Sequence, residues 1–155
     1  SHKITVAAMK FGDMINHRAK DYVFDIEKFT ASEGKTGTFL LYTIARINSI
    51  LKKANCDHAE LKIQKIYSDP ERELILILAL SNEVYELAYN EKAPNFICEN
   101  AYKIASAFSK FYNENHIMNE LDTAKKSAWL HLCESTKIIL QKHLDILGIE
   151  SVELM

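Results

Sequence analysis

The stretch "LILILAL", Leu74 to Leu80, decides the fold class, because alternating leucine and isoleucine suit a buried strand as well as a helix. The preceding segment "SDPE", Ser68 to Glu71, has the features of a helix start: a capping serine, a proline for the first turn, and acids near the positive end of the helix dipole. We therefore expect a helix here rather than a strand.

The same helical period extends along the chain on both sides of this stretch. Only four glycines and two prolines interrupt it, so long elements are expected. The spacing of apolar residues predicts helices over residues 3–20, from Gly37 to about Ala54 with Thr36 as N-cap, over "SNEVYELAYN", from Ala93-Pro94 to about Asn113, and from about Thr123 to Leu147, where Gly148 ends the last helix. The sequence thus predicts an all-α helical bundle that forms a single domain over residues 1–155.

Composition limits the function classes. A chain of 155 residues with 48% apolar residues can bury one real core. The net charge of −2 gives no general attraction to nucleic acid, so any RNA binding must come from a local arrangement of side chains. No apolar run has the length of a membrane span and no signal peptide opens the chain, which predicts a cytoplasmic protein without a membrane partner. Ser1 and His2 have the character of a tag remnant.

The three cysteines indicate reduced thiols. Cys56, Cys98 and Cys133 are odd in number, far apart and without C-x-x-C spacing, which argues against both a disulfide framework and a zinc site. His131 and Cys133 are two residues apart on one expected helix, point about 200° apart, and cannot share a metal. We expect no metal site and no catalytic residues.

The segment Gly34-Lys35-Thr36 raises the question of a nucleotide-binding loop. Such a loop needs a second glycine at position 29, where this chain has Phe29, and it follows a buried strand, which the polar segment before it does not predict. The glycines instead predict a tight turn, in which Gly34 and Gly37 supply positive φ between two helices.

The helix after this turn has two distinct faces. Its core face is predicted to consist of Leu40, Ile44, Ile47 and Leu51. Another sector carries Phe39, Tyr42, Arg46 and Ser49, and two aromatic rings with a guanidinium group form a surface suited to stacking flat groups and meeting negative charge. The alternative is that both rings pack against a neighbouring helix while Arg46 reaches water. Phe108 and Tyr112, spaced i, i+4, form a second pair, with the same alternative of core packing.

The segment "HRAKDYVFDIEKFTASEGKTGTFLLYTIARINSILKKA", His17 to Ala54, resembles the start of the C-terminal anticodon-binding helical domain of arginyl-tRNA synthetases, a domain of the DALR type. That family shows D-Y-x-F-D and then S-x-E-G-x-T-G-x-[YF]-L-x-Y-x-x-x-R-x-x-S-I. The end of the chain is also similar, since the family commonly finishes on L-G-[IL]-x-x-x-x-x-M. The matched residues are Asp21, Tyr22, Phe24, Asp25, Glu33, Gly34, Thr36, Gly37, Phe39, Leu40, Tyr42, Arg46, Ser49, Ile50, Leu147, Gly148, Ile149 and Met155, and Ser32 lies one position closer to Glu33 than the serine of the pattern.

This resemblance implies a role for each feature. The loop with Gly34, Lys35 and Gly37 would lie against the anticodon loop of tRNA(Arg), and the following helix would present Phe39, Tyr42 and Arg46. The resemblance also implies that Phe108, Tyr112 and Met155 close the other side of the anticodon pocket. Four positions depart from residues common in the family. Thr38 replaces a common proline, Trp129 replaces a common basic residue, and Phe39 and Phe108 lack the hydroxyl of the tyrosine often seen at their positions.

The resemblance further implies that the chain is part of a larger enzyme. The H-I-G-H-like and K-M-S-K-S-like motifs of the class I active site do not occur, so we expect a fragment that is inactive alone. ATP, with Mg²⁺, would be used by the catalytic domain of the same polypeptide, and we expect a monomer. Two alternatives stay open: the anticodon domain of another class I synthetase such as the cysteinyl enzyme, or a protein-interaction bundle that buries all four aromatic residues of the two pairs.

Overall fold

The computed structural model describes residues 2–55, 63 and 65–152. Within these residues the regular structure consists of helices without a strand, which confirms the all-α prediction. The helices, in chain order, are α1 (His2–Met14), α2 (Ile26–Thr30), α3 (Gly37–Ala54), α4 (Asp69–Ala79), α5 (Ser81–Glu91), α6 (Asn95–Glu114), the 3-10 turn η2 (Ile117–Asn119) and α7 (Thr123–Ile146).

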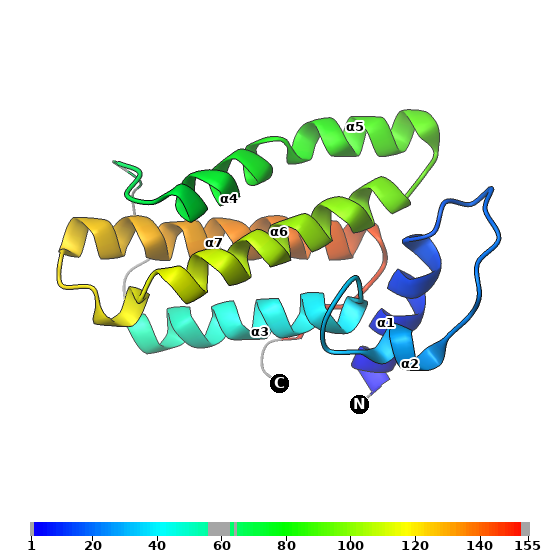
Figure 1. Cartoon of the computed structure of the whole chain (residues 1–155), viewed down its shortest axis with the longest axis horizontal. Helices are drawn as coiled ribbons and strands as arrows, with labels where there is room; N and C mark the ends of the chain where they lie inside the picture. The colour runs from blue at the N-terminus through cyan, green and yellow to red at the C-terminus, as the bar shows by residue number, and fades with distance from the viewer. Residues whose placement is uncertain (1, 56–62, 64, 153–155) are drawn as a thin grey trace.

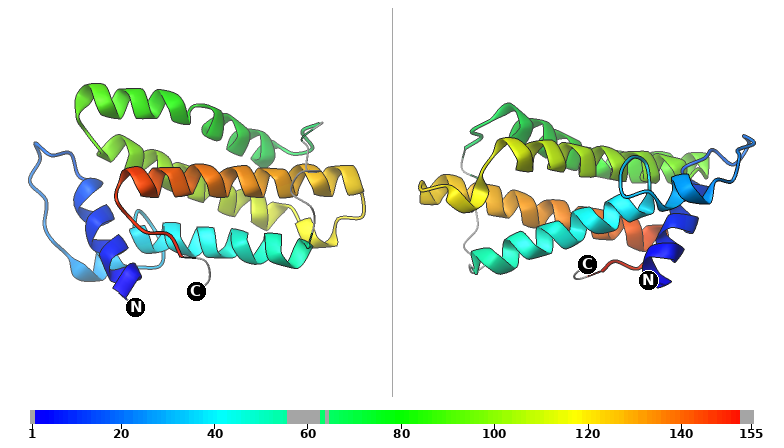
Figure 2. Two further views of the ribbon diagram at one scale, coloured as in Figure 1. Left: turned by 180° about the vertical axis from the view of Figure 1, so that it is seen from behind. Right: turned by 60° about the horizontal axis from the view of Figure 1, so that its bottom comes forward.

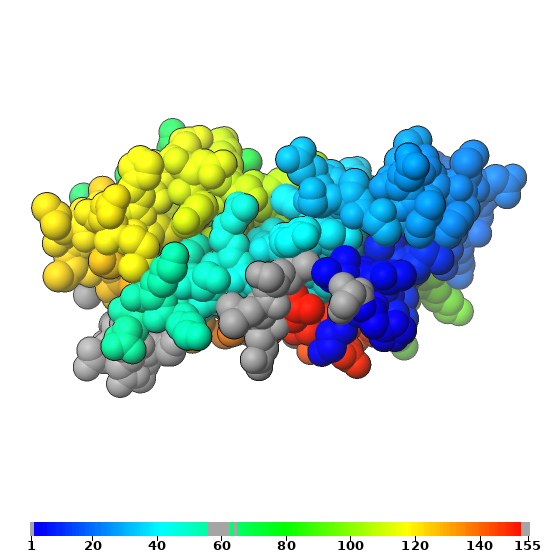
Figure 3. Space-filling view, turned by 90° about the horizontal axis from the view of Figure 1, so that it is seen from below, coloured from blue at the N-terminus to red at the C-terminus, as the bar shows by residue number. Residues whose placement is uncertain are grey.

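Three long helices, α3, α6 and α7, run along the length of the molecule and pack on one another (Figures 1 and 2). Helices α4 and α5 lie along α6, while α1 and α2 lie at the end where α3 begins. The predicted core face of α3 is confirmed, since its four residues are at most 7% exposed. Figure 3 shows α3 on the same face of the molecule as the C-terminal part of α6 and the turn that follows it.

The deciding stretch is helical, as expected. Ser68 caps α4 by accepting a hydrogen bond from the backbone N–H of Glu71 at 3.3 Å, and Pro70 occupies the first turn. Leu74 and Leu78 are buried, whereas Leu76 and Leu80 are about half exposed, so only one face of the apolar run enters the core. The end signal at Gly148 is also confirmed, because this glycine follows the last helix with φ +66°.

Near the N-terminus one predicted boundary was wrong and one short helix was not predicted. The helix expected over residues 3–20 ends at Met14, because the Asn16 side chain donates to the carbonyl of Gly12 at 2.7 Å and the chain turns away. The short helix α2 was not expected. Asp25 caps it by accepting from the backbone N–H groups of Glu27 and Lys28, a pattern that a closer reading of "DIEK" would reveal.

Trp129 lies in the core rather than on the surface and links α7 to α4. Its Nε1 donates to Oε2 of Glu71 at 3.2 Å, and the same oxygen accepts from the backbone N–H of Tyr67 at 2.8 Å. Cys98 and Cys133 are free and buried, and burial raises the pKa of each thiol to about 12. Both thiols are therefore protonated core groups, and Cys56 lies outside the described residues.

Candidate nucleic-acid interface

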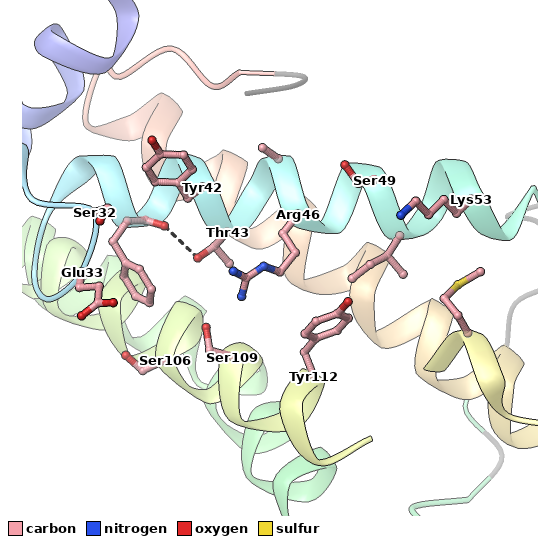
Figure 4. A pocket seen from close by; sticks show the side chains of 14 residues that line it. Ser32, Glu33, Tyr42, Thr43, Arg46, Ser49, Lys53, Ser106, Ser109 and Tyr112 are labelled. Carbon is pink, nitrogen blue, oxygen red and sulfur yellow. Dashed lines mark hydrogen bonds between the residues drawn. The ribbon is translucent and has the colours of Figure 1, made fainter. Parts of the chain in front are cut away.

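A groove of about 930 Å³ lies between α3 and α6 (Figure 4). We call it the α3–α6 groove. From Phe39 to Lys53 it extends along about 20 Å of α3 at 1.5 Å per residue. Its lining consists of Phe39, Tyr42, Thr43, Ala45, Arg46, Ser49, Ile50 and Lys53 from α3, Ser106, Ser109 and Tyr112 from α6, Ser32 and Glu33 from the loop before α3, and Met118 from η2.

The three α3 residues singled out in the sequence line this groove in different ways. Tyr42 is 42% exposed and its ring projects from α3 on the side away from α6 (Figure 4). Arg46 is exposed and extends into the space between the helices, with its guanidinium carbon 5.8 Å from the centre of the Tyr112 ring. Phe39 is half-buried against Tyr102, at 6.0 Å between ring centres. The groove therefore holds one cation over the Tyr112 ring, and the exposed Tyr42 ring lies at its outer edge on α3.

The second aromatic pair is divided between the groove and the core. Tyr112 lines the groove and is half-buried, whereas Phe108 is 0% exposed and does not line it. The two rings are stacked at 6.1 Å with an angle of 18° between their planes. Phe108 is thus corrected to a core residue that supports Tyr112 from behind, because a fully covered ring offers no face to a base. The protein-interaction alternative, which would bury all four aromatic residues, does not fit the exposed Tyr42.

The glycine-bearing loop is held closed by Thr36, the N-cap of α3. The Thr36 hydroxyl accepts from the backbone N–H of Phe39 at 3.1 Å and donates to the carbonyl of Ala31 at 2.7 Å. Gly34 has φ +84°, as predicted for a turn. Gly37 does not have positive φ. It is buried at the start of α3, where an added Cβ would lie 2.3 Å from the carbonyl oxygen of Ala7 in α1, so its role is close helix packing.

Lys35 is engaged within the protein. Its Nζ lies 2.8 and 2.9 Å from the two carboxylate oxygens of Glu99 on α6, and 5.7 Å from the centre of the Tyr102 ring. In this arrangement the side chain ties the loop to α6 rather than pointing freely toward a ligand. Met155, the last predicted contact, lies outside the described residues.

Sequence reasoning missed several groove residues. Ser106, Ser109 and Tyr112 are spaced by three, which places them on one face of α6, and this spacing could have found the two serines. Helical spacing gives no signal for Glu33 and Met118, because a loop and a turn bring them to the groove; Glu33 had been noted only as a match to the family pattern. A smaller hollow of about 260 Å³ adjoins the groove and shares Tyr112 and Met118 with it.

The chemistry of the α3–α6 groove suits binding rather than catalysis. Serine hydroxyls donate and accept hydrogen bonds, Arg46 only donates, and the rings of Tyr42 and Tyr112 supply flat surfaces. Over the described ranges, no group of three or more histidine, cysteine or acidic residues is placed to hold a metal ion. In the same part of the chain, none of the helices combines the length and apolar character needed to cross a membrane.

An all-helical bundle whose groove combines one exposed and two half-buried aromatic rings with a guanidinium group has the chemistry of proteins that bind unpaired nucleic-acid bases. The chain belongs to the DALR anticodon binding domain family, whose model matches residues 40–155.

The relatives found by sequence agree with this family. The chain is 43% identical to an arginine–tRNA ligase of Alkaliphilus oremlandii over 157 residues, covering 100% of this chain and 27% of the ligase. It is 39% identical to the corresponding ligase of Agathobacter rectalis, covering 98% of this chain and 26% of that protein. The chain therefore spans about a quarter of the length of these relatives.

Two of the solved structures that match are also arginyl-tRNA synthetases. The enzyme from Plasmodium falciparum superposes with a TM-score of 0.85 at 25% identity, over 99% of this chain and 27% of that chain. The Thermus thermophilus enzyme, at 24% identity, shares the fold with a TM-score of 0.86, over 99% of this chain and 27% of that one.

Proposed function

We propose that this chain binds the anticodon arm of tRNA(Arg) as one domain of an arginine–tRNA ligase. The observation that carries the proposal is the α3–α6 groove, where Arg46 lies over the Tyr112 ring and Tyr42 is exposed. Membership of an anticodon-binding family supports it, as does the similarity to arginine–tRNA ligases.

Stacking supplies the binding energy in this proposal. Unpaired bases turned out of an RNA loop are read on aromatic or guanidinium planes and by hydrogen bonds to their edges. Each stacked base contributes about 1–3 kcal/mol, which allows affinity in a chain of net charge −2. Lys53 stands at one end of the groove, where it would meet a phosphate (Figure 4).

The rest of the enzyme is proposed from the relatives. A domain of about a quarter of their length would act together with a catalytic domain of the same polypeptide, where ATP and Mg²⁺ would be used, and would be inactive alone. We also propose that residues 1–155 form one anticodon-binding domain, and that the whole enzyme is monomeric and cytoplasmic.

A titration with matched variants tests the proposal. The chain is titrated with the anticodon stem-loop of tRNA(Arg) and with one altered at the middle anticodon base. We expect preference for the unaltered loop, and loss of at least tenfold in affinity in Tyr42→Ala plus Arg46→Ala. The control, Tyr89→Ala plus Arg72→Ala, removes the same residue types from exposed positions on α5 and α4. Equal binding of both loops, or equal losses in both double variants, would contradict the proposal.

A further inference from the structure

Glu33 stands out because it is the one acidic residue among the described residues that line the groove, beside hydroxyls, aromatic rings, cations and a few apolar side chains. Figure 4 shows Ser32 and Glu33 at one end of the α3–α6 groove and Lys53 at the other. An acidic side chain beside an anionic polymer weakens binding through like-charge repulsion, unless it accepts a hydrogen bond from that polymer.

The loop holds the Glu33 backbone from both sides. After it, the backbone N–H of Thr36 donates to the carbonyl of Gly34 at 2.9 Å, and the ion pair of Lys35 with Glu99 ties the loop to α6 at 2.8 Å. Before it, the carbonyl of Ala31 accepts from the Thr36 hydroxyl at 2.7 Å. The residue is thus carried by a closed loop at the mouth of the groove.

The Glu33 carboxylate is not paired with the neighbouring cation. The adjacent cation, Lys35, is already paired with Glu99. Among the residues that the structure describes, no hydrogen bond or ion pair engages the Glu33 side chain. An unengaged carboxylate only accepts hydrogen bonds, so its complement on a nucleic acid is an N–H donor on a base edge.

We propose that Glu33 is a specificity residue of the groove, accepting a hydrogen bond from the exocyclic amino group of an unpaired cytosine. This inference rests on the proposed tRNA-binding function. Carboxylates pair with the N4 amino group of cytosine, whereas uracil carries a carbonyl oxygen there that would repel the carboxylate. Every arginine codon has G in the middle, so every tRNA(Arg) offers cytosine at the middle anticodon position. The hydroxyls and Arg46 are then left to donate to the acceptor atoms of the same loop.

A single-group deletion on the RNA isolates this contact. Stem-loops carry either cytosine or pyrimidin-2-one, which is cytosine without its amino group, at the middle anticodon position. The wild-type chain should bind the cytosine loop about tenfold more tightly. In Glu33→Ala the ratio of the two affinities should fall close to one. The control Glu27→Ala removes an exposed acid on α2 that does not line the groove, and should keep the wild-type ratio.

The outcomes separate this inference from the proposed function. An unchanged ratio in Glu33→Ala, or an equal gain in affinity for both loops, overturns the role of Glu33 while leaving anticodon binding intact. If the wild-type chain binds neither loop, the proposed function fails and the inference fails with it.

Discussion

At the scale of single residues, the contact between Arg46 and Tyr112 places a cation and an aromatic ring together in the groove. The two side chains come from different helices and meet at 5.8 Å, and Phe108 supports the Tyr112 ring from within the core. A base entering the groove would therefore meet a ring whose position is fixed by packing. Such preorganisation lowers the entropy that binding costs.

Thr38 provides a prediction about stability at this scale. It is 3% exposed at the start of α3, and its hydroxyl has no hydrogen-bond partner within the described part of the chain. Thr38→Val keeps the shape and removes the unsatisfied group, so we expect the free energy of unfolding to rise by about 1 kcal/mol. Urea denaturation measures the change.

Thr136→Val is the matched control for this substitution. Thr136 is equally buried, but its hydroxyl donates to the carbonyl of Leu132 at 2.7 Å, so the same change should give no gain. A lower denaturation midpoint in Thr38→Val than in the wild type would show that the hydroxyl is satisfied after all.

At the scale of elements, the packing of α1 on α3 depends on Gly37. A Cβ there would lie 2.3 Å from a backbone oxygen of α1, which cannot move without shifting the helix. We expect Gly37→Ala to lower the free energy of unfolding by about 3 kcal/mol. Thermal or urea unfolding followed by circular dichroism measures this loss.

The substitution Gly34→Ala measures the cost of backbone strain without a steric clash. Nothing lies within 4 Å of a Cβ at this position, so only its φ of +84° opposes the substitution. The cost should be about 1 kcal/mol, clearly less than at Gly37. The reverse order of the two losses would contradict the packing described for α1 and α3.

Element boundaries could be predicted where a capping side chain or a glycine ends the helix. Thr36, Ser68 and Gly148 mark ends that the structure confirms, because each acts through local hydrogen bonds or backbone geometry. The early end of α1 could not be obtained from apolar spacing, which continues through Ile15. It depends on the Asn16 side chain, which turns back and donates to the carbonyl of Gly12. This side-chain hydrogen bond competes with the backbone hydrogen bonds of the helix, and the spacing of apolar residues does not reveal it.

The site was only partly predictable for a related reason. Helical spacing correctly places Phe108 and Tyr112 on one side of α6. It does not show that neighbouring helices cover Phe108 completely and leave Tyr112 half-buried. Likewise, spacing along α3 does not reveal that the loop brings Glu33 to the same groove. Both facts depend on how separate elements pack together.

At the scale of the whole molecule, His143 joins three helices in one buried cluster. Its Nδ1 lies 2.9 Å from the Tyr85 hydroxyl on α5 and 2.8 Å from the carbonyl of Ile139, and its Nε2 lies 2.7 Å from Oδ1 of Asn100 on α6. Burial, assisted by the charge of Lys142 and opposed by the Ile139 contact, lowers the pKa of His143 below its usual 6.5.

This lowered pKa predicts how stability depends on pH. The unfolded chain protonates this histidine near pH 6.5, whereas the folded chain does so only at lower pH. The unfolded state therefore binds more protons between these two values, and the free energy of unfolding should fall as the pH drops from 6.5. Urea denaturation at pH 7.5, 6.5 and 5.5 tests this, with His143→Gln expected to flatten the slope. An equal slope in the variant would assign the effect to other groups.

NMR of the isotope-labelled chain, titrated with the tRNA(Arg) anticodon stem-loop, tests whether RNA occupies the α3–α6 groove. We expect the resonances of Ser49, Ser106, Ser109 and Tyr112 to shift together and saturate at one equivalent, while those of exposed Leu76 and Leu87 on α4 and α5 stay unchanged. Shifts centred on α4 and α5, or no saturable shifts in the groove, would contradict it.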